Sequence, residues 1–222
     1  MENPMHRKMP ARLSRRHAVA IIGAALLAVR LRIRPARASG TVAQFIEQLG
    51  DKAILQLADP AISDGEREKR FRALLEENFD VPRIGRFVLG RYVRQATKQE
   101  MGEFTQLYED IAVLTYAHLF ASYAGERFKI KREVGDPGDR YKMVMTEVEP
   151  RDGKPPIKLD WQVKVNGDSY AVVDIRVEGA SMAITQRAEY TAVLDRNGGD
   201  MADLLAQLRD KIAKLRAERS SS

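Results

Sequence analysis

The chain has 222 residues, which is enough for one well-buried domain and short for two compact domains of about 100 to 150 residues each. Its 37 Lys and Arg against 31 Asp and Glu give a net charge of +6, but residues 1–38 hold nine basic side chains and one acid, so residues 39–222 carry about −2. A near-neutral remainder excludes the positive field that holds a nucleic-acid backbone. The absence of cysteine excludes disulfides, thiolate nucleophiles and Cys-ligated metals.

The beginning of the chain has the order of a bacterial export signal. Residues 1–17 are polar and basic, residues 18–29 are apolar or small, and Ala36-Arg37-Ala38 supplies a small-x-small cleavage site. Twelve apolar residues span roughly 18 Å as a helix, well short of a bilayer core of about 30 Å. We therefore predict a signal peptide at residues 1–38, one domain at residues 39–222 and a periplasmic location, with an uncleaved amphipathic anchor as the alternative. A Ser-Arg-Arg sequence in the basic segment leaves the twin-arginine and general export routes both open.

The first half of the remaining chain has helical periodicity, with apolar side chains at three- and four-residue spacing. Ser63 with Glu66 and Thr97 with Glu100 have the spacing of capping boxes, which mark helix starts. The pattern predicts helices over residues 42–57, from Ser63 to about Asn78, from Asp80 to about Leu89, from Thr97 to about Tyr123, and from Asp200 onward.

The apolar period changes from 3.6 to 2 after residue 127, which predicts strands around residues 128–132, 141–146, 157–165 and 169–177. Asn166-Gly167 is a strong hairpin signal between the last two. After Ser181 the pattern is compatible with a strand or a helix as far as Gly198. We expect an α+β fold in which the N-terminal helices and a C-terminal helix pack on one face of a four-stranded antiparallel sheet.

Catalytic chemistry has few candidates in this sequence. Beyond residue 38 the only histidine is His118, so a two-His metal site cannot be built, and no phosphate-binding glycine loop occurs. Asp160 and Asp174 lie on neighbouring expected strands and could approach as paired carboxylates, although a solvated sheet face explains them more simply. We therefore expect no cofactor, no metal and no enzyme activity. An envelope hydrolase or isomerase that uses Asp160, Asp174 or His118 is the rival hypothesis.

Several segments together resemble one known family, the MlaC family, which is also called the toluene-tolerance auxiliary family. The resemblance covers roughly residues 41–215, with Val93 and Tyr170 at positions where tryptophan is common. The matching residues are Phe79-Asp80, Ile84, Arg86-Phe87-Val88-Leu89-Gly90-Arg91-Tyr92, Ala96-Thr97, Glu103-Phe104, Tyr116, Leu159-Asp160-Trp161, Val173-Asp174-Ile175-Arg176-Val177-Glu178-Gly179-Ala180-Ser181 and Glu189-Tyr190.

The resemblance implies a periplasmic carrier that shuttles phospholipid between an outer-membrane lipoprotein complex and an inner-membrane ABC permease with its substrate-binding subunit. Such a carrier serves the lipid asymmetry of the outer membrane. A similar branch handles hopanoids, so phospholipid and hopanoid both stand as expected ligands. An adaptor that only bridges membrane complexes, with a filled core, is a further alternative.

A lipid carrier must enclose acyl chains in an apolar cavity between the helices and the buried face of the sheet. Periodicity alone does not distinguish a filled interior from a hollow one. We expect ten apolar residues to line the cavity and bind lipid, because their faces point toward the expected interior: Leu107, Ile111, Leu114, Met143, Met145, Val163, Val173, Ile175, Met182 and Ile184.

Overall fold

The computed structural model describes residues 40–122 and 126–220, and the expected export signal at residues 1–38 lies outside them. Within the described residues, no helix combines the length and the apolarity that crossing a bilayer requires. The helices are α2 (Val42–Leu57), α3 (Asp64–Asn78), α4 (Val81–Leu89), η1 (Gly90–Arg94), α5 (Lys98–Tyr116), η2 (Ala117–Ser122), α6 (Met182–Arg196) and α7 (Met201–Ser220).

The expected helix starts are made by side-chain caps. The Thr97 hydroxyl accepts a hydrogen bond from the Glu100 amide, and the Glu100 carboxylate accepts one from the Thr97 amide, which completes a capping box. The Ser63 hydroxyl likewise accepts from the amide of residue 66 at the start of α3. Asp200 accepts from two amides in the first turn of α7. Four of the five expected helices have the expected bounds within a residue or two. The fourth ends as α5 at Tyr116 and continues as the 3₁₀ turn η2.

The sheet is antiparallel throughout and its strands follow one another in chain order, β1-β2-β3-β4-β5. It has five strands where the sequence predicts four, because two residues after a turn pair with the end of β4 and form the short β5. The strands are β1 (Arg127–Val134), β2 (Tyr141–Glu149), β3 (Ile157–Asn166), β4 (Ser169–Val177) and β5 (Ala180–Ser181).

The segment after Ser181, for which the sequence allows a strand or a helix, forms the helix α6. Its buried residues Ala183, Tyr190 and Leu194 are seven and four residues apart, which is helical spacing. Polar residues occupy most of the positions between them, so the apolar stripe is narrow. That narrow stripe explains why the sequence pattern alone did not distinguish a helix from a strand.

The side chains of β2 face the opposite way from the prediction. Val144, Thr146 and Val148 are the buried residues of this strand, and the side chains between them are only half-buried. Since successive side chains of a strand point to opposite faces, Met143 and Met145 lie on the face away from the core. The error arises because β2 has apolar side chains at both alternations, and the larger methionines were assigned to the interior.

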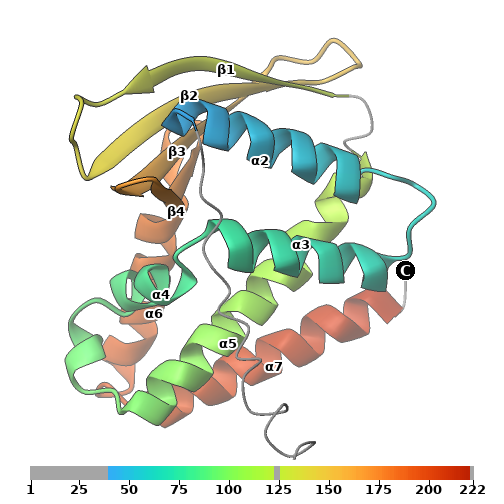
Figure 1. The fold of residues 1–222 in the computed structure, drawn as a ribbon. Helices are drawn as coiled ribbons and strands as arrows, with labels where there is room; N and C mark the ends of the chain where they lie inside the picture. The colour runs from blue at the N-terminus through green and yellow to red at the C-terminus, as the bar shows by residue number, and fades with distance from the viewer. Residues whose placement is uncertain (1–39, 123–125, 221–222) are drawn as a thin grey trace, which may run out of the picture. The chain divides into compact units, whose positions relative to one another are not determined.

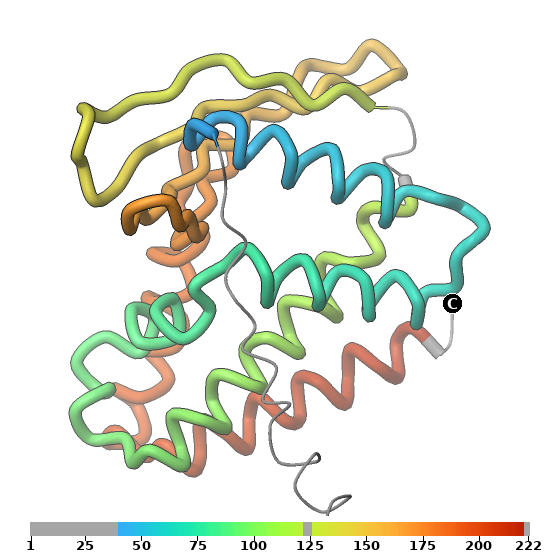
Figure 2. The backbone as a smooth tube through the Cα atoms, in the orientation of Figure 1, coloured from blue at the N-terminus to red at the C-terminus, as the bar shows by residue number. Residues whose placement is uncertain are grey.

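The helices are arranged in layers on one face of the sheet. α2 packs on β1 and β2, α3 packs on α2, and α5 with α7 lies beyond α3 (Figure 1). α4 and α6 pack on each other and on β4. Figure 2 shows the path of α5 and η2 from the α7 side up to the C-terminal end of α2, which η2 contacts.

The apolar core consists of two clusters rather than one. The first joins the end of α3 with α4, α5, α6 and α7 around Phe104, which is fully buried. The second joins α2 and α3 to the sheet around Ile46, Val144 and Val163, which are also fully buried. The two clusters meet at α3, which contributes residues to both. The packing around this helix therefore determines whether the two clusters form one filled core or leave a cavity between them.

Two polar contacts hold the ends of α3. At its beginning the buried Arg67 donates through Nη1 to the carbonyl of Leu57, 2.5 Å away, and so fixes the connection from α2. After its end, the Asp80 amide donates to the Val172 carbonyl of β4 at 3.0 Å, and the Asp80 carboxylate pairs with Lys164 of β3 at 2.9 Å. The helix α3 is therefore attached to α2 at one end and to the sheet at the other.

Gly50 sets how closely α2 approaches the sheet. A Cβ atom at this position would lie 2.5 Å from the Phe128 ring of β1. We expect Gly50→Ala to lower the free energy of unfolding by about 1 to 3 kcal/mol, because the ring or the helix must move. Urea unfolding measures this change.

Gly102→Ala is the matched control, since Gly102 lies in α5 with nothing within 4 Å of its Cβ position. This substitution should raise the free energy of unfolding by about 0.5 to 1 kcal/mol, as expected for an exposed helical glycine. A Gly50→Ala protein as stable as the Gly102→Ala protein would contradict the proposed close contact.

Candidate functional site

A cavity of about 500 Å³ lies between the two core clusters. Residues of the first cluster such as Ile84 and Tyr108 and residues of the second such as Leu57 and Leu74 both line it. Its volume is within the range of about 300 to 1,000 Å³ that is typical of small-molecule sites. The interior of this fold is therefore hollow where α3 passes between the clusters.

The sheet contributes one wall of this cavity through β1, β2, β3 and β4. Trp161 of β3 lies opposite Ile175 of β4 on this wall, and both line the cavity. Two residues before Ile175, β4 contains a bulge. Gln162 pairs with Asp174 and Val163 pairs with Val172, so Val173 has no partner in β3. At the bulge, Val172 is buried in the core and Val173 lines the cavity, so two successive residues of β4 both face the interior.

Helices α2 and α3 contribute the opposite wall. Small residues of α2, Gly50 and Ala53, leave room at the wall, while Ile54 and Leu57 cover it. Phe71 of α3 packs against Phe120 of η2 with ring centroids 5.9 Å apart, and both rings line the cavity. The lining is almost wholly hydrocarbon, which suits acyl chains or another apolar ligand and offers little to a polar substrate.

Among the described residues, Asp174 is the one carboxylate that lines this cavity, and both of its oxygens accept hydrogen bonds. It is 9% exposed, accepts a hydrogen bond from the Ser181 hydroxyl at 2.6 Å, and accepts another from the Ala183 amide at 3.0 Å. The Ser181 hydroxyl in turn accepts from the Ile184 amide. Asp174 thus anchors the start of α6 to β4.

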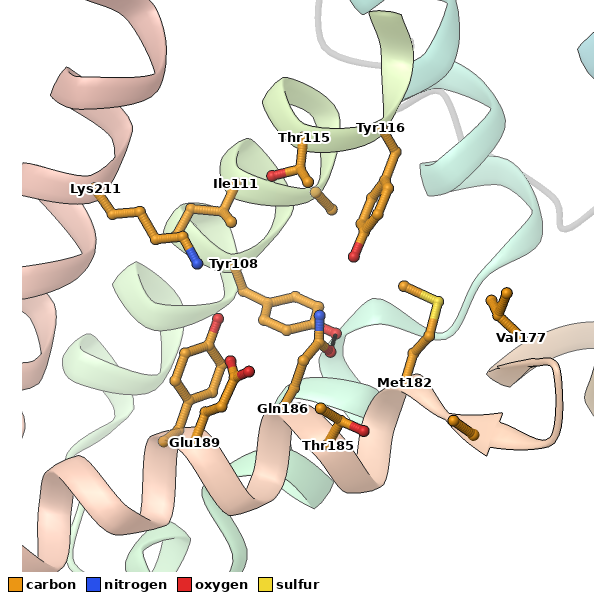
Figure 3. Close-up of a pocket in the computed structure, with 13 residues that line it drawn as sticks. Tyr108, Ile111, Thr115, Tyr116, Val177, Met182, Thr185, Gln186, Glu189 and Lys211 are labelled. Atoms are coloured by element: carbon orange, nitrogen blue, oxygen red, sulfur yellow. Dashed lines mark hydrogen bonds between the residues drawn. The ribbon is translucent and has the colours of Figure 1, made fainter. Parts of the chain in front are cut away.

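A smaller and more polar pocket of about 330 Å³ adjoins the apolar cavity, with residues from α5, α6 and α7 in its walls (Figure 3). Tyr108, Tyr116, Met182 and Gln186 line both spaces. Tyr108 donates a hydrogen bond to Gln186 Oε1 across this boundary. The apolar cavity therefore passes into a polar compartment at its α5–α6 side.

The tyrosines at the boundary stay neutral. Burial raises the pKa of Tyr116, and the negative charge of Glu189 adds to that rise. Burial and the same carboxylate raise the pKa of Tyr190 to about 12. Burial also raises the pKa of Tyr108. All three hydroxyl groups are consequently hydrogen-bond donors at neutral pH and carry no charge.

The ten predicted lining residues fall into three groups. Val173, Ile175 and Met182 line the apolar cavity, and Ile111 and Met182 line the polar pocket. Leu107, Leu114 and Val163 pack in the core clusters without lining either space. Met143, Met145 and Ile184 do not face the interior. The first two are on the other face of β2, and Ile184 is 60% exposed on α6.

The walls contributed by α2 and α3 are not among the lining residues that the sequence predicts. Leu49, Ala53 and Leu57 belong to the apolar stripe that predicts a helix over residues 42–57, so these wall residues were visible in the sequence. The stripe does not show how far α2 lies from the element that it faces. That distance determines whether its apolar residues pack in a filled core or line a cavity.

The strand register does not pair the two carboxylates that were considered for catalysis. In the β3–β4 register Asp160 lies opposite Arg176, and Asp174 lies opposite Gln162, so the two carboxylates are not cross-strand partners. His118 is exposed at η2 and contacts Arg219 of α7 through Nδ1 at 3.1 Å. Across residues 40–122 and 126–220, no three His, Asp or Glu side chains cluster as a metal ligand set would.

The two hydrogen bonds that Asp174 accepts should be important for stability. We expect Asp174→Ala to lower the free energy of unfolding by about 1.5 to 3 kcal/mol, because a buried hydroxyl and a buried amide lose a charged acceptor. Hydrogen exchange should speed up at the amides of residues 183 and 184 in the first turn of α6.

Asp210→Ala is the control for this substitution, since Asp210 is exposed on α7. It should change the free energy of unfolding by less than about 0.5 kcal/mol. Unchanged exchange at the start of α6 in the Asp174→Ala protein would refute the anchoring role.

Comparison with known proteins shows a family and a similar fold. A family model described as MlaC protein matches residues 47–210, which is more than half of the chain. Among solved structures, the fold is similar to that of a phospholipid-binding protein from Ralstonia solanacearum in complex with a phospholipid. The TM-score is 0.72 and the identity 20%, over 80% of this chain and 99% of that chain. No curated protein matches the chain.

Proposed function

The chain belongs to the MlaC family, and from this premise we propose that it is a non-catalytic carrier that encloses the acyl chains of a phospholipid in its apolar cavity. The observation that carries the proposal is the cavity of about 500 Å³ between the two core clusters, with an almost wholly hydrocarbon lining. The phospholipid complex of the Ralstonia solanacearum protein, which has a similar fold, supports the same ligand class.

The physics of lipid transfer through water requires such an enclosure. Each methylene that leaves an apolar environment costs about 0.8 kcal/mol, so two chains with roughly 30 methylenes would cost about 25 kcal/mol. A free lipid therefore does not cross an aqueous space at a useful rate. A carrier removes this cost by surrounding the chains, and the chemistry needs no base, nucleophile or metal.

A bound apolar ligand would also stabilise the folded protein. Apolar side chains that face an unfilled space lack part of their van der Waals contacts, and an apolar occupant would supply those contacts. We propose that Val173, Ile175 and Met182 contact the acyl chains together with the α2 and α3 walls.

The location and partners follow from the proposed leader and the family. Residues 1–38 would direct export, and residues 39–222 would act in the periplasm. There the protein would receive and deliver phospholipid at an outer-membrane lipoprotein complex and at an inner-membrane ABC permease with its substrate-binding subunit. Because spontaneous loss of enclosed chains is slow, delivery would require docking that opens the cavity.

Solvent extraction of the purified protein tests the ligand directly. We expect mass spectrometry of the extract to find phospholipid at close to one molecule per chain. A hopanoid in its place would redirect the proposal to that cargo, and protein that is consistently free of lipid when purified without detergent would refute the carrier function.

A cavity-filling variant tests where the lipid binds. Ala53→Phe places a ring in the cavity from α2, so we expect it to reduce the lipid per chain at least severalfold while the protein stays folded. Ala73→Phe is the control, since Ala73 is exposed on α3 and outside the lining. Equal lipid content in the two variants would place the ligand elsewhere, and circular dichroism checks that both are folded.

A further inference from the structure

We propose that the polar pocket beside the apolar cavity binds the headgroup of the enclosed phospholipid and favours a zwitterionic headgroup, a phosphodiester that carries an amine. This inference rests on the proposed carrier function and concerns the lipid class that the carrier selects. It follows from the position of the pocket and from the two opposite charges at its walls.

The position of the pocket suits a headgroup. Tyr108, Tyr116 and Gln186 line both the apolar cavity and the polar pocket, so a molecule that extends from one space enters the other without leaving the protein. A phospholipid has this order of parts, with apolar chains joined through glycerol to a polar headgroup. The polar pocket has about 330 Å³ of space for the second part.

Two side chains of opposite charge reach into the pocket from different helices. Lys211 extends from α7 and Glu189 from α6 toward the same space (Figure 3). Both side chains are exposed, and within the described residues neither is part of an ion pair. The lysine ammonium complements a phosphodiester oxygen, and the glutamate carboxylate complements an amine.

Neutral donors at the boundary complete the site. Tyr108 holds Gln186 Oε1, so Gln186 presents its Nε2 hydrogens as donors. Burial raises the pKa of Tyr116, which keeps its hydroxyl a neutral donor, and Figure 3 shows this hydroxyl directed into the pocket. Ester and phosphate oxygens near the glycerol are acceptors only, and they match donors of this kind.

The charge pair predicts selection between lipids. A zwitterionic headgroup satisfies Lys211 and Glu189 together, whereas an anionic headgroup without an amine satisfies only Lys211 and leaves its negative charge near Glu189. Because both side chains are exposed and screened by solvent, each contact should change affinity only about twofold to fivefold. The expected selectivity is therefore modest and depends on salt.

The test loads the delipidated protein from vesicles with equal amounts of phosphatidylethanolamine and phosphatidylglycerol and measures both lipids in the recovered protein. We expect the wild-type protein to be enriched about twofold to fivefold in phosphatidylethanolamine at low salt. Glu189→Gln should bring the ratio close to that of the vesicles. Lys211→Ala should lower the uptake of both lipids about twofold to fivefold.

Matched controls and total lipid separate the possible failures. Glu47→Gln on α2 and Lys214→Ala on α7 change exposed charges outside the pocket and should behave as wild type. A wild-type ratio equal to that of the vesicles, or variants with the same lipid ratio and uptake as their controls, would overturn this inference while leaving the carrier function intact. A wild-type protein that takes up no lipid would instead refute the carrier function.

A soluble headgroup distinguishes the source of the recognised chemistry. Glycerophosphoethanolamine, added in excess over the vesicle lipid, should displace little bound phospholipid, because the enclosed chains supply most of the binding free energy. Displacement of the lipid by this soluble compound would show that the pocket serves a free metabolite, and the headgroup assignment would be withdrawn.

Discussion

The apolar walls formed by α2, α3 and the sheet face one another across a cavity that their side chains do not fill. The rest of the structure depends on how the backbone keeps these walls apart. Apolar surface gains free energy when it leaves water, so these walls would approach each other if the backbone allowed it. Gly50 and the bulge at Val173 are where the backbone sets their separation. An apolar ligand supplies the contacts that the side chains lack.

Polar interactions keep the elements in place around this space without entering it. Arg72 of α3 pairs with Glu109 and Asp110 of α5, each at 2.6 Å, on the side of α3 toward α5. Arg219 of α7 contacts Glu68 of α3 and the Leu114 carbonyl. Such half-exposed pairs add little stability each, but they fix helix positions. Among the described residues, Asp174 is the one charged side chain in the hydrocarbon lining, and each of its oxygens accepts a hydrogen bond.

Residue patterns predicted the type of most elements but left the segment of α6 open between helix and strand and did not predict β5. The cavity was expected only from the family resemblance. The capping residues Thr97 and Glu100 and the hairpin turn at Asn166 are local signals, and they located helix and strand ends correctly. Tertiary packing determines which face of β2 is buried and whether the segment after Ser181 is a helix or a strand. Whether Leu114 fills the core or Val173 lines a cavity depends on a few ångströms between elements, and residue spacing carries no such distance.

The attachments at the two ends of α3 have a mechanical consequence. Arg67 joins this helix to α2, while Asp80 pins its far end to Val172 and Lys164 of the sheet. The start of α2 is also tied to the sheet, because the Ala43 amide donates to Glu133 of β1 at 3.0 Å and the Tyr170 hydroxyl of β4 donates to the Gly40 carbonyl at 2.7 Å. The remaining contact of α2 with β1 and β2 is chiefly apolar. Apolar surfaces can slide without breaking directional bonds, so the resistance to widening the space between α2–α3 and the sheet comes mainly from these few hydrogen bonds and from the ion pairs of α3 with α5 and α7.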